Sequence, residues 1–328
     1  MEPVEVVEDI AVRILKTNPN PVVRFRLLRD VLRWPADGEI VCEAREDLMK
    51  SRWVKELKRE QRKDGSWGRF HSQDTRQGQK IVTTEAGVTR GLTLGLTAGD
   101  PILGETAPYL VDLLKGAIQF PDPAERNNRW PAGVHLFVAG TLAALCPDLS
   151  ELVPVRRLWA EIAWRTFVSG EYNPEAEWLA HCDLTGATDM RDSYLVIRNR
   201  YAVALLGSRV TVLPEGIGEV FGDWIWAHGK GIGYLDMPLS RLLSQVRNRV
   251  VERWLQSQEL LSPFPVWRVL AKEVVEDLWS LRDATGLWDF GPGANAHNLH
   301  LSESWRKRHD RAYDHSTRVL ALLRRYYG

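Results

Sequence analysis

The sequence is poor in cysteine: its 328 residues contain three, at Cys42, Cys146 and Cys182. An odd number of widely spaced cysteines does not make the paired framework of a small, disulfide-rich secreted domain. Residues 1–10 are acidic and lack the basic segment and apolar run of a secretory signal. We therefore expect a protein of a reducing compartment, the cytoplasm.

An excess of charge of one sign and a long apolar run are also missing. Lys plus Arg and Asp plus Glu both number 43, so the overall charge favours neither nucleic acid nor an anionic membrane. The longest strongly apolar window, 133–146, is shorter than the roughly 20 residues that cross a bilayer. We expect no nucleic-acid partner and no transmembrane segment, and the sequence leaves the oligomeric state open.

Runs of alternating polar and apolar residues are absent as well, and helical periodicity dominates. The apolar patterns come in pairs, separated by breakers such as Asn18-Pro-Asn-Pro21. Helices are predicted at 3–15, 21–32, 39–63, 82–96, 103–118, 131–145, 153–168, 190–206, 214–227, 239–255, 265–282 and 311–326.

Six helical hairpins can close into a ring with one helix of each hairpin inside. We predict an all-α protein whose residues 1–328 form one domain, an (α/α)6 toroid with a central cavity. Four long segments each lead from the first helix of a pair to the second, so we expect them at one rim of the ring, where long loops are usually functional. These segments are 64–81, 119–130, 169–188 and 284–309.

Tryptophan is abundant, with 14 residues, and two of them follow similar turns. The turns are Gln61-Arg-Lys-Asp-Gly-Ser-Trp67 and Leu281-Arg-Asp-Ala-Thr-Gly-Leu-Trp288. A turn-plus-Trp signature that recurs in a helix-rich chain indicates a helical repeat. We expect Gly65 to supply the turn geometry and Trp67 the packing area that fasten one hairpin to the next.

The pattern QxxDGSW at 61–67 resembles the QW repeat of terpenoid cyclases and of protein prenyltransferase β subunits. It is also similar to the prenyltransferase/squalene oxidase repeat proteins of bacteria. The segments Thr285–Gly291 and Ser302–Leu320 resemble the last repeat of such proteins. The resemblance implies an α/α toroid and a lyase or isomerase that acts on an isoprenoid.

Class II terpenoid cyclases protonate their substrate with the central Asp of a DxDD motif, and this sequence contains no DxDD. The nearest acidic cluster, Asp183, Asp189 and Asp192, leads into the helix predicted at 190–206. Together with Glu85 it supplies the catalytic candidates, as general acid or base. A second interpretation makes Thr188 or Asp189 a helix cap, with acidic neighbours that complement the helix dipole.

We predict no cofactor and no metal centre. Asp189 and Asp192 would share a helix face and could hold Mg²⁺ there. The prenyltransferase resemblance implies a zinc site of separated Asp, Cys and His ligands. The adjacent residues His181, Cys182 and Asp183 do not reproduce that separation.

Charged residues are frequent on the predicted inner helices. A cavity that cyclises a hydrocarbon should be apolar, whereas inward arginines suit a phosphate, a carboxylate or a sugar through paired hydrogen bonds. A second interpretation is that these residues form structural ion pairs between adjacent inner helices. The substrate-binding candidates are Arg24, Arg90, Arg198, Arg241, Trp130, Tyr194 and His315.

Three functions remain open from the sequence, each with a small-molecule ligand or a partner in the central cavity. The first is the terpenoid-cyclase-like lyase or isomerase, acting on an isoprenoid or another anionic small molecule. The second is a carbohydrate-active (α/α)6 glycosidase or lyase, with Glu85 and either Asp189 or Asp192 as its carboxylate pair. The third is a toroid that binds without catalysis.

Overall fold

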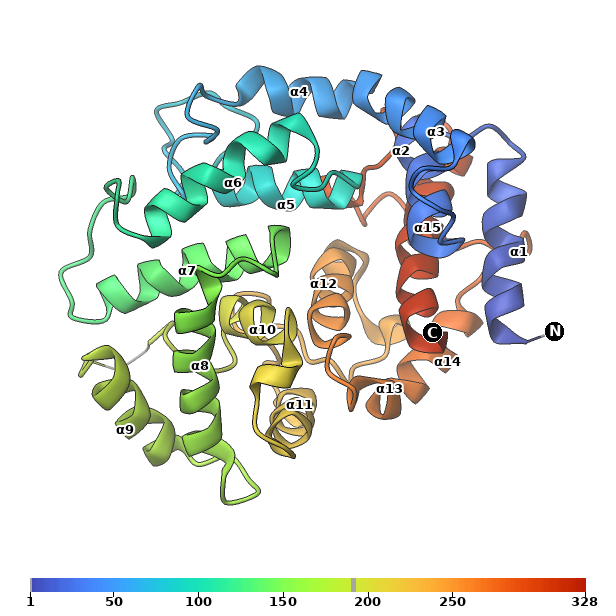
Figure 1. The fold of residues 1–328 in the computed structure, drawn as a ribbon. Helices are drawn as coiled ribbons and strands as arrows, with labels where there is room; N and C mark the ends of the chain where they lie inside the picture. Colours follow the sequence, from blue (N-terminus) through green and yellow to red (C-terminus); the bar gives the residue numbers. More distant parts are fainter. Residues whose placement is uncertain (1, 190–192) are drawn as a thin grey trace.

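The structure, a computed structural model, describes residues 2–189 and 193–328. Over these residues it contains 15 α-helices, five shorter helical segments and no β-strand, which confirms the all-α prediction (Figure 1). None of the described helices is long and apolar enough to cross a membrane. The α-helices are α1 Pro3–Leu15, α2 Pro21–Arg26, α3 Glu39–Lys50, α4 Arg52–Glu60, α5 Thr84–Leu94, α6 Pro101–Leu114, α7 Trp130–Leu145, α8 Leu152–Phe167, α9 Pro174–Thr185, α10 Arg200–Gly207, α11 Ile217–Ala227, α12 Val251–Leu261, α13 Trp267–Leu270, α14 Lys272–Ser280 and α15 Arg308–Tyr327.

Three predicted helices are interrupted. The helix predicted at 265–282 is divided at Ala271 into α13 and α14. Helix α2 continues as the π-helical segment η1, Leu27–Val31. The helix predicted at 39–63 breaks at Ser51, which has extended backbone and whose hydroxyl accepts a hydrogen bond from the Val54 N–H. A serine at such a position caps a new helix instead of continuing the old one.

The other differences from the predicted helices lie in the long connections from α8 to α10 and from α11 to α12. The helix predicted at 190–206 is α10, which begins at Arg200 behind the cap Asn199. The helix predicted at 239–255 is α12, which begins at Val251 and is preceded by two short 3-10 turns. The segment 169–188, expected as a polar loop, contains α9.

Six helices lie next to one another in chain order. Contacts join α5 to α7, α7 to α10, α10 to α12, α12 to α15 and α15 to α2, and Arg26 of α2 hydrogen-bonds to the carbonyl of Thr93 in α5. Helices α4, α6, α8 and α1 contact α5, α7, α10 and α15, respectively, and lie outside them in Figure 1. The first and last parts of the chain are therefore packed side by side.

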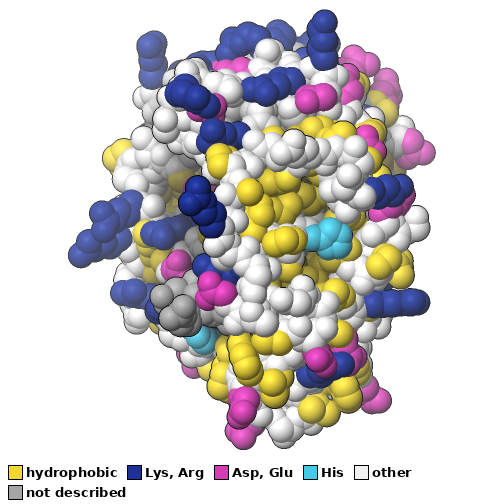
Figure 2. Space-filling view, turned by 90° about the vertical axis from the view of Figure 1, so that its left-hand side faces the viewer, with side chains coloured by type: hydrophobic (Ala, Val, Ile, Leu, Met, Phe, Trp, Pro, Cys, Tyr) yellow, Lys and Arg dark blue, Asp and Glu magenta, His cyan; other side chains and the backbone are white. Residues whose placement is uncertain are grey.

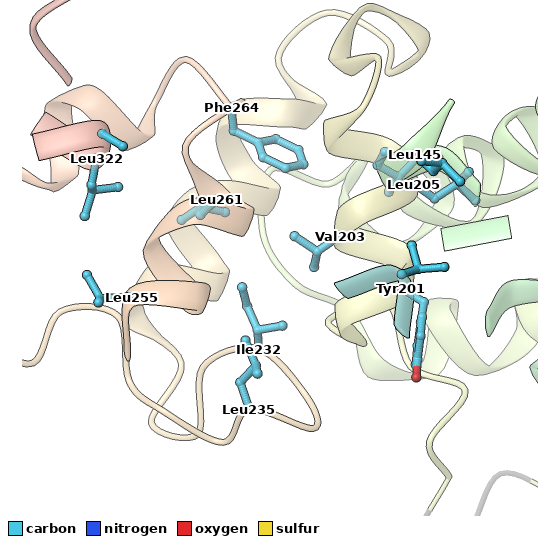
Figure 3. Close-up of a cluster of buried hydrophobic side chains, with 14 of the residues drawn as sticks. Leu145, Tyr201, Val203, Leu205, Ile232, Leu235, Leu255, Leu261, Phe264 and Leu322 are labelled. Carbon is cyan, nitrogen blue, oxygen red and sulfur yellow. The ribbon is translucent and has the colours of Figure 1, made fainter. Parts of the chain in front are cut away.

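Large apolar side chains of α10, α12, α15 and the segments beside them form a buried cluster (Figure 3). Val203 and Leu205 of α10 are fully buried, as is Leu255 of α12. The loop residue Ile232 and Phe264, which follows α12, are also fully buried. Burial of this kind contributes about 1.5–3 kcal/mol for each large apolar side chain.

The surface charge is uneven although the net charge is zero. Figure 2 shows a face on which Lys and Arg side chains gather along the upper edge, at the height of α3 and α4 in Figure 1, above an apolar area. Helix α4 supplies Arg52, Lys55, Lys58 and Arg59 within nine residues.

The two turn-plus-Trp motifs have the same contacts. Trp67 is fully buried, and its indole N–H donates to the Leu57 carbonyl at 3.0 Å while its backbone N–H donates to the Thr84 hydroxyl. Trp288 repeats this with the Leu278 carbonyl, at 2.6 Å, and the Ser316 hydroxyl. Trp67 thus joins the end of α4 to the start of α5, and Trp288 joins the end of α14 to the middle of α15.

Gly65→Ala is expected to lower the free energy of unfolding by about 3 kcal/mol or more. Gly65 has φ +84°, and a Cβ atom there would lie 2.1 Å from the carbonyl oxygen of Glu105, a backbone atom. Gly116→Ala is the control, because Gly116 has φ +67° and open space around it, so its cost is the backbone term of about 1–2 kcal/mol. Equal losses in urea unfolding would contradict the close approach at Gly65.

Candidate functional site

A cavity of about 310 Å³ lies between the six helices that follow one another in contact. Its volume is at the lower end of the about 300–1,000 Å³ that is usual for small-molecule sites. Every one of these helices contributes to the wall. The lining residues are Arg26 of α2; Val88, Thr89, Leu92 and Thr93 of α5; Gly140, Thr141 and Ala144 of α7; Arg200, Tyr201 and Ala204 of α10; Leu235; Gln256, Glu259 and Leu260 of α12; and Arg318 and Arg325 of α15.

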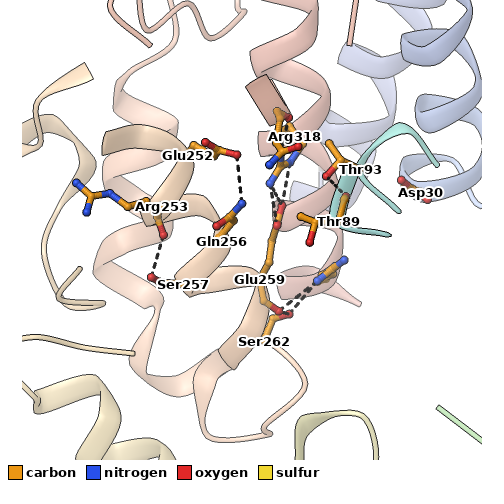
Figure 4. A network of polar contacts seen from close by, with 12 residues as sticks. Asp30, Thr89, Thr93, Glu252, Arg253, Gln256, Ser257, Glu259, Ser262 and Arg318 are labelled. Atoms are coloured by element: carbon orange, nitrogen blue, oxygen red, sulfur yellow. Dashed lines mark hydrogen bonds and ion pairs between the residues drawn. The ribbon is translucent and has the colours of Figure 1, made fainter. Parts of the chain in front are cut away.

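Ion pairs cross the cavity wall, as one interpretation of the sequence predicted. Arg318 of α15 binds both carboxylate oxygens of Glu259 in α12 at 2.8 Å, and Figure 4 shows Thr89 of α5 beside this pair. Arg26 pairs with Asp30. The pair of Arg318 with Glu259 joins α15 to α12, whereas the pair of Arg26 with Asp30 lies within α2 and its continuation η1. Removing one partner of either pair leaves the other charge uncompensated.

A second group of polar residues gathers at the N-terminal ends of α5 and α10. Glu85 is 8% exposed. Its carboxylate accepts hydrogen bonds from the Tyr201 hydroxyl and from Arg200, and its Oε2 atom lies 2.9 Å from Nδ1 of His71. The Tyr201 hydroxyl is also 3.0 Å from that Nδ1 atom. We call His71, Glu85, Arg200 and Tyr201 the Glu85 cluster.

Aromatic rings surround His71. Phe137 stacks on it with ring centroids 5.0 Å apart, and Tyr234 meets its edge at 5.5 Å. Tyr194 packs on Phe137 at 5.4 Å. The His71 side chain is 30% exposed and Tyr234 is 39% exposed, so a ligand can reach this end of the molecule from solvent.

Local hydrogen bonds place these residues. The Asp122 carboxylate accepts from the backbone N–H groups of Phe70, His71 and Ser72, which fixes the loop that carries His71. The Thr83 hydroxyl caps α5 just before Glu85. The Asn199 side chain caps α10 by accepting from the Tyr201 N–H at 2.9 Å.

The protonation states follow from these contacts. Burial acts to raise the pKa of Glu85, but Arg200 and the hydrogen bonds from His71 and Tyr201 outweigh burial, so the pKa lies below its ordinary value. Burial and the Glu85 charge raise the pKa of Tyr201 well above its ordinary range. At neutral pH the cluster therefore contains a carboxylate and a neutral phenol that donates to it.

The structure separates the predicted acidic residues from one another. Asp183 lies on α9, where its 73% exposed side chain pairs with Arg165 of α8 at 2.9 Å. Asp189 is not helical, which corrects its predicted place on a helix face and as a helix cap, and its carboxylate lies 3.8 Å from Arg129. Asp192 lies outside the described residues.

Two of the arginines predicted to bind substrate contact residues that do not line the cavity. Arg24 of α2 pairs with Glu43 and Asp47 of the neighbouring α3. Arg90 of α5 is 1% exposed; it lies over the Trp53 ring and donates from Nη1 to the His297 carbonyl.

Arg198 and Arg241 precede α10 and α12 and lie outside both helices, which corrects their predicted positions. Both helices begin later than their apolar patterns suggested. Arg198 donates to the Gly231 carbonyl at 3.1 Å, and Arg241 is exposed. The Arg198 contact ties the segment before α10 to the loop that contains Gly231.

The remaining candidates are aromatic. Trp130 begins α7 and packs against Phe120, while Tyr194 belongs to the aromatic surroundings of His71. His315 is fully buried next to Phe290. The described lining of the cavity includes none of the seven substrate-binding candidates: Arg24, Arg90, Arg198, Arg241, Trp130, Tyr194 and His315.

Sequence reasoning missed His71, Tyr201 and Tyr234 as site residues. His71 lies in a loop with no recognisable motif, and Tyr201 meets it from 130 residues away. Tyr234 follows the turn at 229–233 and has φ +69°, an unusual conformation for a residue other than glycine. The one residue of this cluster that the sequence analysis named as a candidate was Glu85, at the start of a predicted inner helix.

We expect the stability of the protein to fall as the pH drops from about 6.5 to about 4. Burial lowers the pKa of His315 to about 4, so over this range the unfolded chain takes up a proton that the folded protein does not. The stabilising contribution is present above the unfolded pKa and is lost as the pH falls.

The variant His315→Asn keeps an acceptor for the Phe290 N–H, which donates to Nδ1 of His315 at 3.2 Å. It should be less stable than the wild type at pH 7 but should lose less stability between pH 6.5 and 4. Denaturant midpoints at four pH values measure this. Parallel curves for the two proteins would show that His315 does not titrate as described.

Among the residues that the structure describes, no group of three or more His, Cys, Asp or Glu side chains could hold a metal ion. The Glu85 cluster and the cavity are the candidate sites of the described chain. Comparisons with known protein families, curated proteins and solved structures found no significant match.

Proposed function

We propose that the chain is an (α/α)6 toroid of the terpenoid-cyclase and prenyltransferase type. Each of six helices contacts the next one in the series α5, α7, α10, α12, α15 and α2, and this supports a ring of inner helices. All six contribute to the wall of one cavity. Trp67 and Trp288 make the same hydrogen bonds, and this supports the resemblance to QW repeats. Each of them ties the end of one helix to a helix that we place on the inside of the ring.

The function that the geometry supports best is that of a lyase or isomerase, in which the Glu85 cluster transfers a proton of a small molecule. One observation carries this proposal: Glu85, His71 and Tyr201 meet within hydrogen-bond distance at a solvent-accessible, aromatic-walled end of the ring. A neutral imidazole that donates its Nδ1–H to Glu85 has its lone pair on Nε2. His71 Nε2 is then the proton acceptor, and Glu85 is the residue that sets its tautomer.

The direction of proton transfer distinguishes this reaction from that of class II cyclases. Those enzymes begin by protonating the substrate, which requires an acid that stays protonated. The pKa of Glu85 is below its ordinary value and not above it, so the cluster suits a reaction that begins with removal of a proton. The substrate class is an isoprenoid or another small anionic molecule with an acidic C–H bond.

A non-catalytic binding toroid is the second candidate. The ion pairs of Arg318 with Glu259 and of Arg26 with Asp30 favour it, because paired charges stabilise a cavity without taking part in chemistry. A glycosidase is less well supported: of its predicted carboxylate pair, neither Glu85 nor Asp189 lines the cavity. Asp189 lies 3.8 Å from Arg129, and Asp192 lies outside the described residues.

A conversion screen separates the two candidates. Purified protein is incubated with isoprenoid diphosphates and short branched carboxylates, and products are analysed by chromatography and mass spectrometry. We expect a product of unchanged mass from an isomerase, or the loss of a small neutral or anionic fragment from a lyase, and no product from His71→Gln. Binding without conversion by the wild type would favour the binding toroid and contradict the proposed reaction.

A further inference from the structure

The cavity and the Glu85 cluster share Arg200 and Tyr201, but Glu85 and His71 lie outside the cavity lining. On α5, Glu85 comes before the cavity residues Val88–Thr93. On α7, Phe137 contacts His71, whereas the cavity residues begin at Gly140. The cavity therefore lies about one helical turn toward the C-terminal ends of these helices.

The cavity opens at the end away from His71. On α7, Thr141 is buried and Ala144 is exposed, and on α15, Arg318 is 3% exposed and Arg325 is exposed. At the other end, Tyr201 is 2% exposed. Solvent exposure of the wall thus rises toward the C-terminal ends of α7 and α15, where Ala144 and Arg325 mark the mouth.

Three arginines of the wall keep N–H groups without a partner among the described residues. Arg26 uses Nε and Nη1 on Asp30 and on the Thr93 carbonyl, which leaves Nη2. Arg200 uses Nη2 on Glu85, which leaves Nε and Nη1. Arg325 uses Nη1 on the Glu259 carbonyl and the Ser262 hydroxyl, which leaves Nε and Nη2. Guanidinium N–H groups of this kind recognise phosphate and carboxylate oxygens.

The charge at the mouth is positive. Arg26, Arg200 and Arg318 are each neutralised by a carboxylate, whereas the partners of Arg325 are a carbonyl and a hydroxyl. Further arginines surround it. Arg33 donates to the carbonyl of Arg324. The contact of Trp267 with Tyr326, at 5.8 Å, brings α13 and the exposed Arg268 to the end of α15.

Apolar side chains make up part of the wall. Leu92, Ala204 and Leu260 line the cavity between the arginines, together with the hydroxyls of Thr89 and Thr141. A volume of about 310 Å³ suits a ligand of small size. The wall thus combines donors for one oxyanion with apolar area for a short hydrocarbon body.

We propose that this cavity is a second ligand site, which binds a phosphate or carboxylate carried on a short apolar body and admits it between Ala144 and Arg325. The site is coupled to the Glu85 cluster through Arg200, whose guanidinium contacts Glu85 and also lines the cavity. A bound oxyanion competes with Glu85 for Arg200. Occupancy of the cavity therefore alters the electrostatics of His71 without contact between ligand and imidazole.

Calorimetry with hexyl phosphate, hexanoate and hexanol tests the site. We expect at least one of the two anions to bind and hexanol to bind at least about tenfold more weakly. Whether phosphate or carboxylate binds more tightly identifies the oxyanion. No binding of either anion, or equal binding of hexanol, would overturn the proposal.

Variants at the mouth locate the site. Ala144→Trp should weaken anion binding by about tenfold or more because it fills the opening, while Ala144→Ser should bind like the wild type. Arg325→Gln should weaken binding and reduce its dependence on salt. Thermal unfolding of each variant serves as the folding control. Unchanged binding by Ala144→Trp and Arg325→Gln would place the ligand elsewhere.

The His71 ring resonances test the coupling. Titration of the wild type with the bound anion should shift them, and Arg200→Lys should reduce that shift more than it reduces the affinity. Binding at full affinity with unchanged His71 resonances would exclude coupling through Arg200.

Discussion

Trp67→Ala is expected to lower the free energy of unfolding by about 3–5 kcal/mol, the usual cost of truncating a buried aromatic residue. The Trp67 ring is fully buried. Its loss removes the hydrogen bond to the Leu57 carbonyl and leaves a cavity between α4 and α5. Trp288→Ala should cost a similar amount, because its contacts with Leu278 and Ser316 repeat those of Trp67.

Urea unfolding of both variants measures this effect, with Trp178→Ala as the matched control. Trp178 is 44% exposed, and a change at such a position usually alters stability by less than about 0.5 kcal/mol. If Trp67→Ala were no more destabilising than Trp178→Ala, the turn-plus-Trp motif would not fasten the helices as described.

Glu85→Gln is expected to lower turnover of the substrate by a factor of about 10² to 10⁴. A glutamine can donate to Nδ1 of His71 and so favours the tautomer that places the proton on Nε2, where the lone pair is needed. It also leaves Arg200 without its carboxylate. The effect should fall on kcat more than on KM, because the change concerns proton transfer and not the walls of the site.

Glu56→Gln is the matched control. Glu56 is also a buried carboxylate, 6% exposed and paired with Lys80 at 2.8 Å, but it lies on α4. Its replacement should leave kcat unchanged. A similar loss in both variants would indicate a general effect on folding, and full turnover by Glu85→Gln would remove Glu85 from the mechanism.

The sequence predicted those parts of the fold that depend on local signals. The helix at 3–15 agrees with α1, and the helix at 131–145 agrees with α7 to within one residue, because both have a Pro in the first turn and a sustained apolar pattern. The start of α10 could not be predicted. The Gly233 N–H donates to the Arg198 carbonyl, and this contact between distant segments holds the residues before Arg200 out of the helix.

The candidate site shows the same limit. Glu85 was predicted as a site residue because periodicity places it at the start of a helix that we expected on the inside of the ring. Its partner His71 lies in a loop fixed by Asp122, 51 residues further along the chain. Asp183 was proposed from the clustering of acidic residues, but it pairs with Arg165 on the outside of α8. Proximity in sequence is a poor guide where loops bring the chemistry together.

Proton exchange with solvent tests the central claim, that the Glu85 cluster removes a proton from a small molecule. The protein is incubated in deuterated water with the substrate from the conversion screen, and unreacted substrate and product are examined by mass spectrometry. We predict that the wild type incorporates deuterium at one carbon and that Glu85→Gln and His71→Gln do so at least about 10²-fold more slowly. Conversion by the wild type without deuterium incorporation, or equal incorporation by Glu85→Gln, would contradict the account.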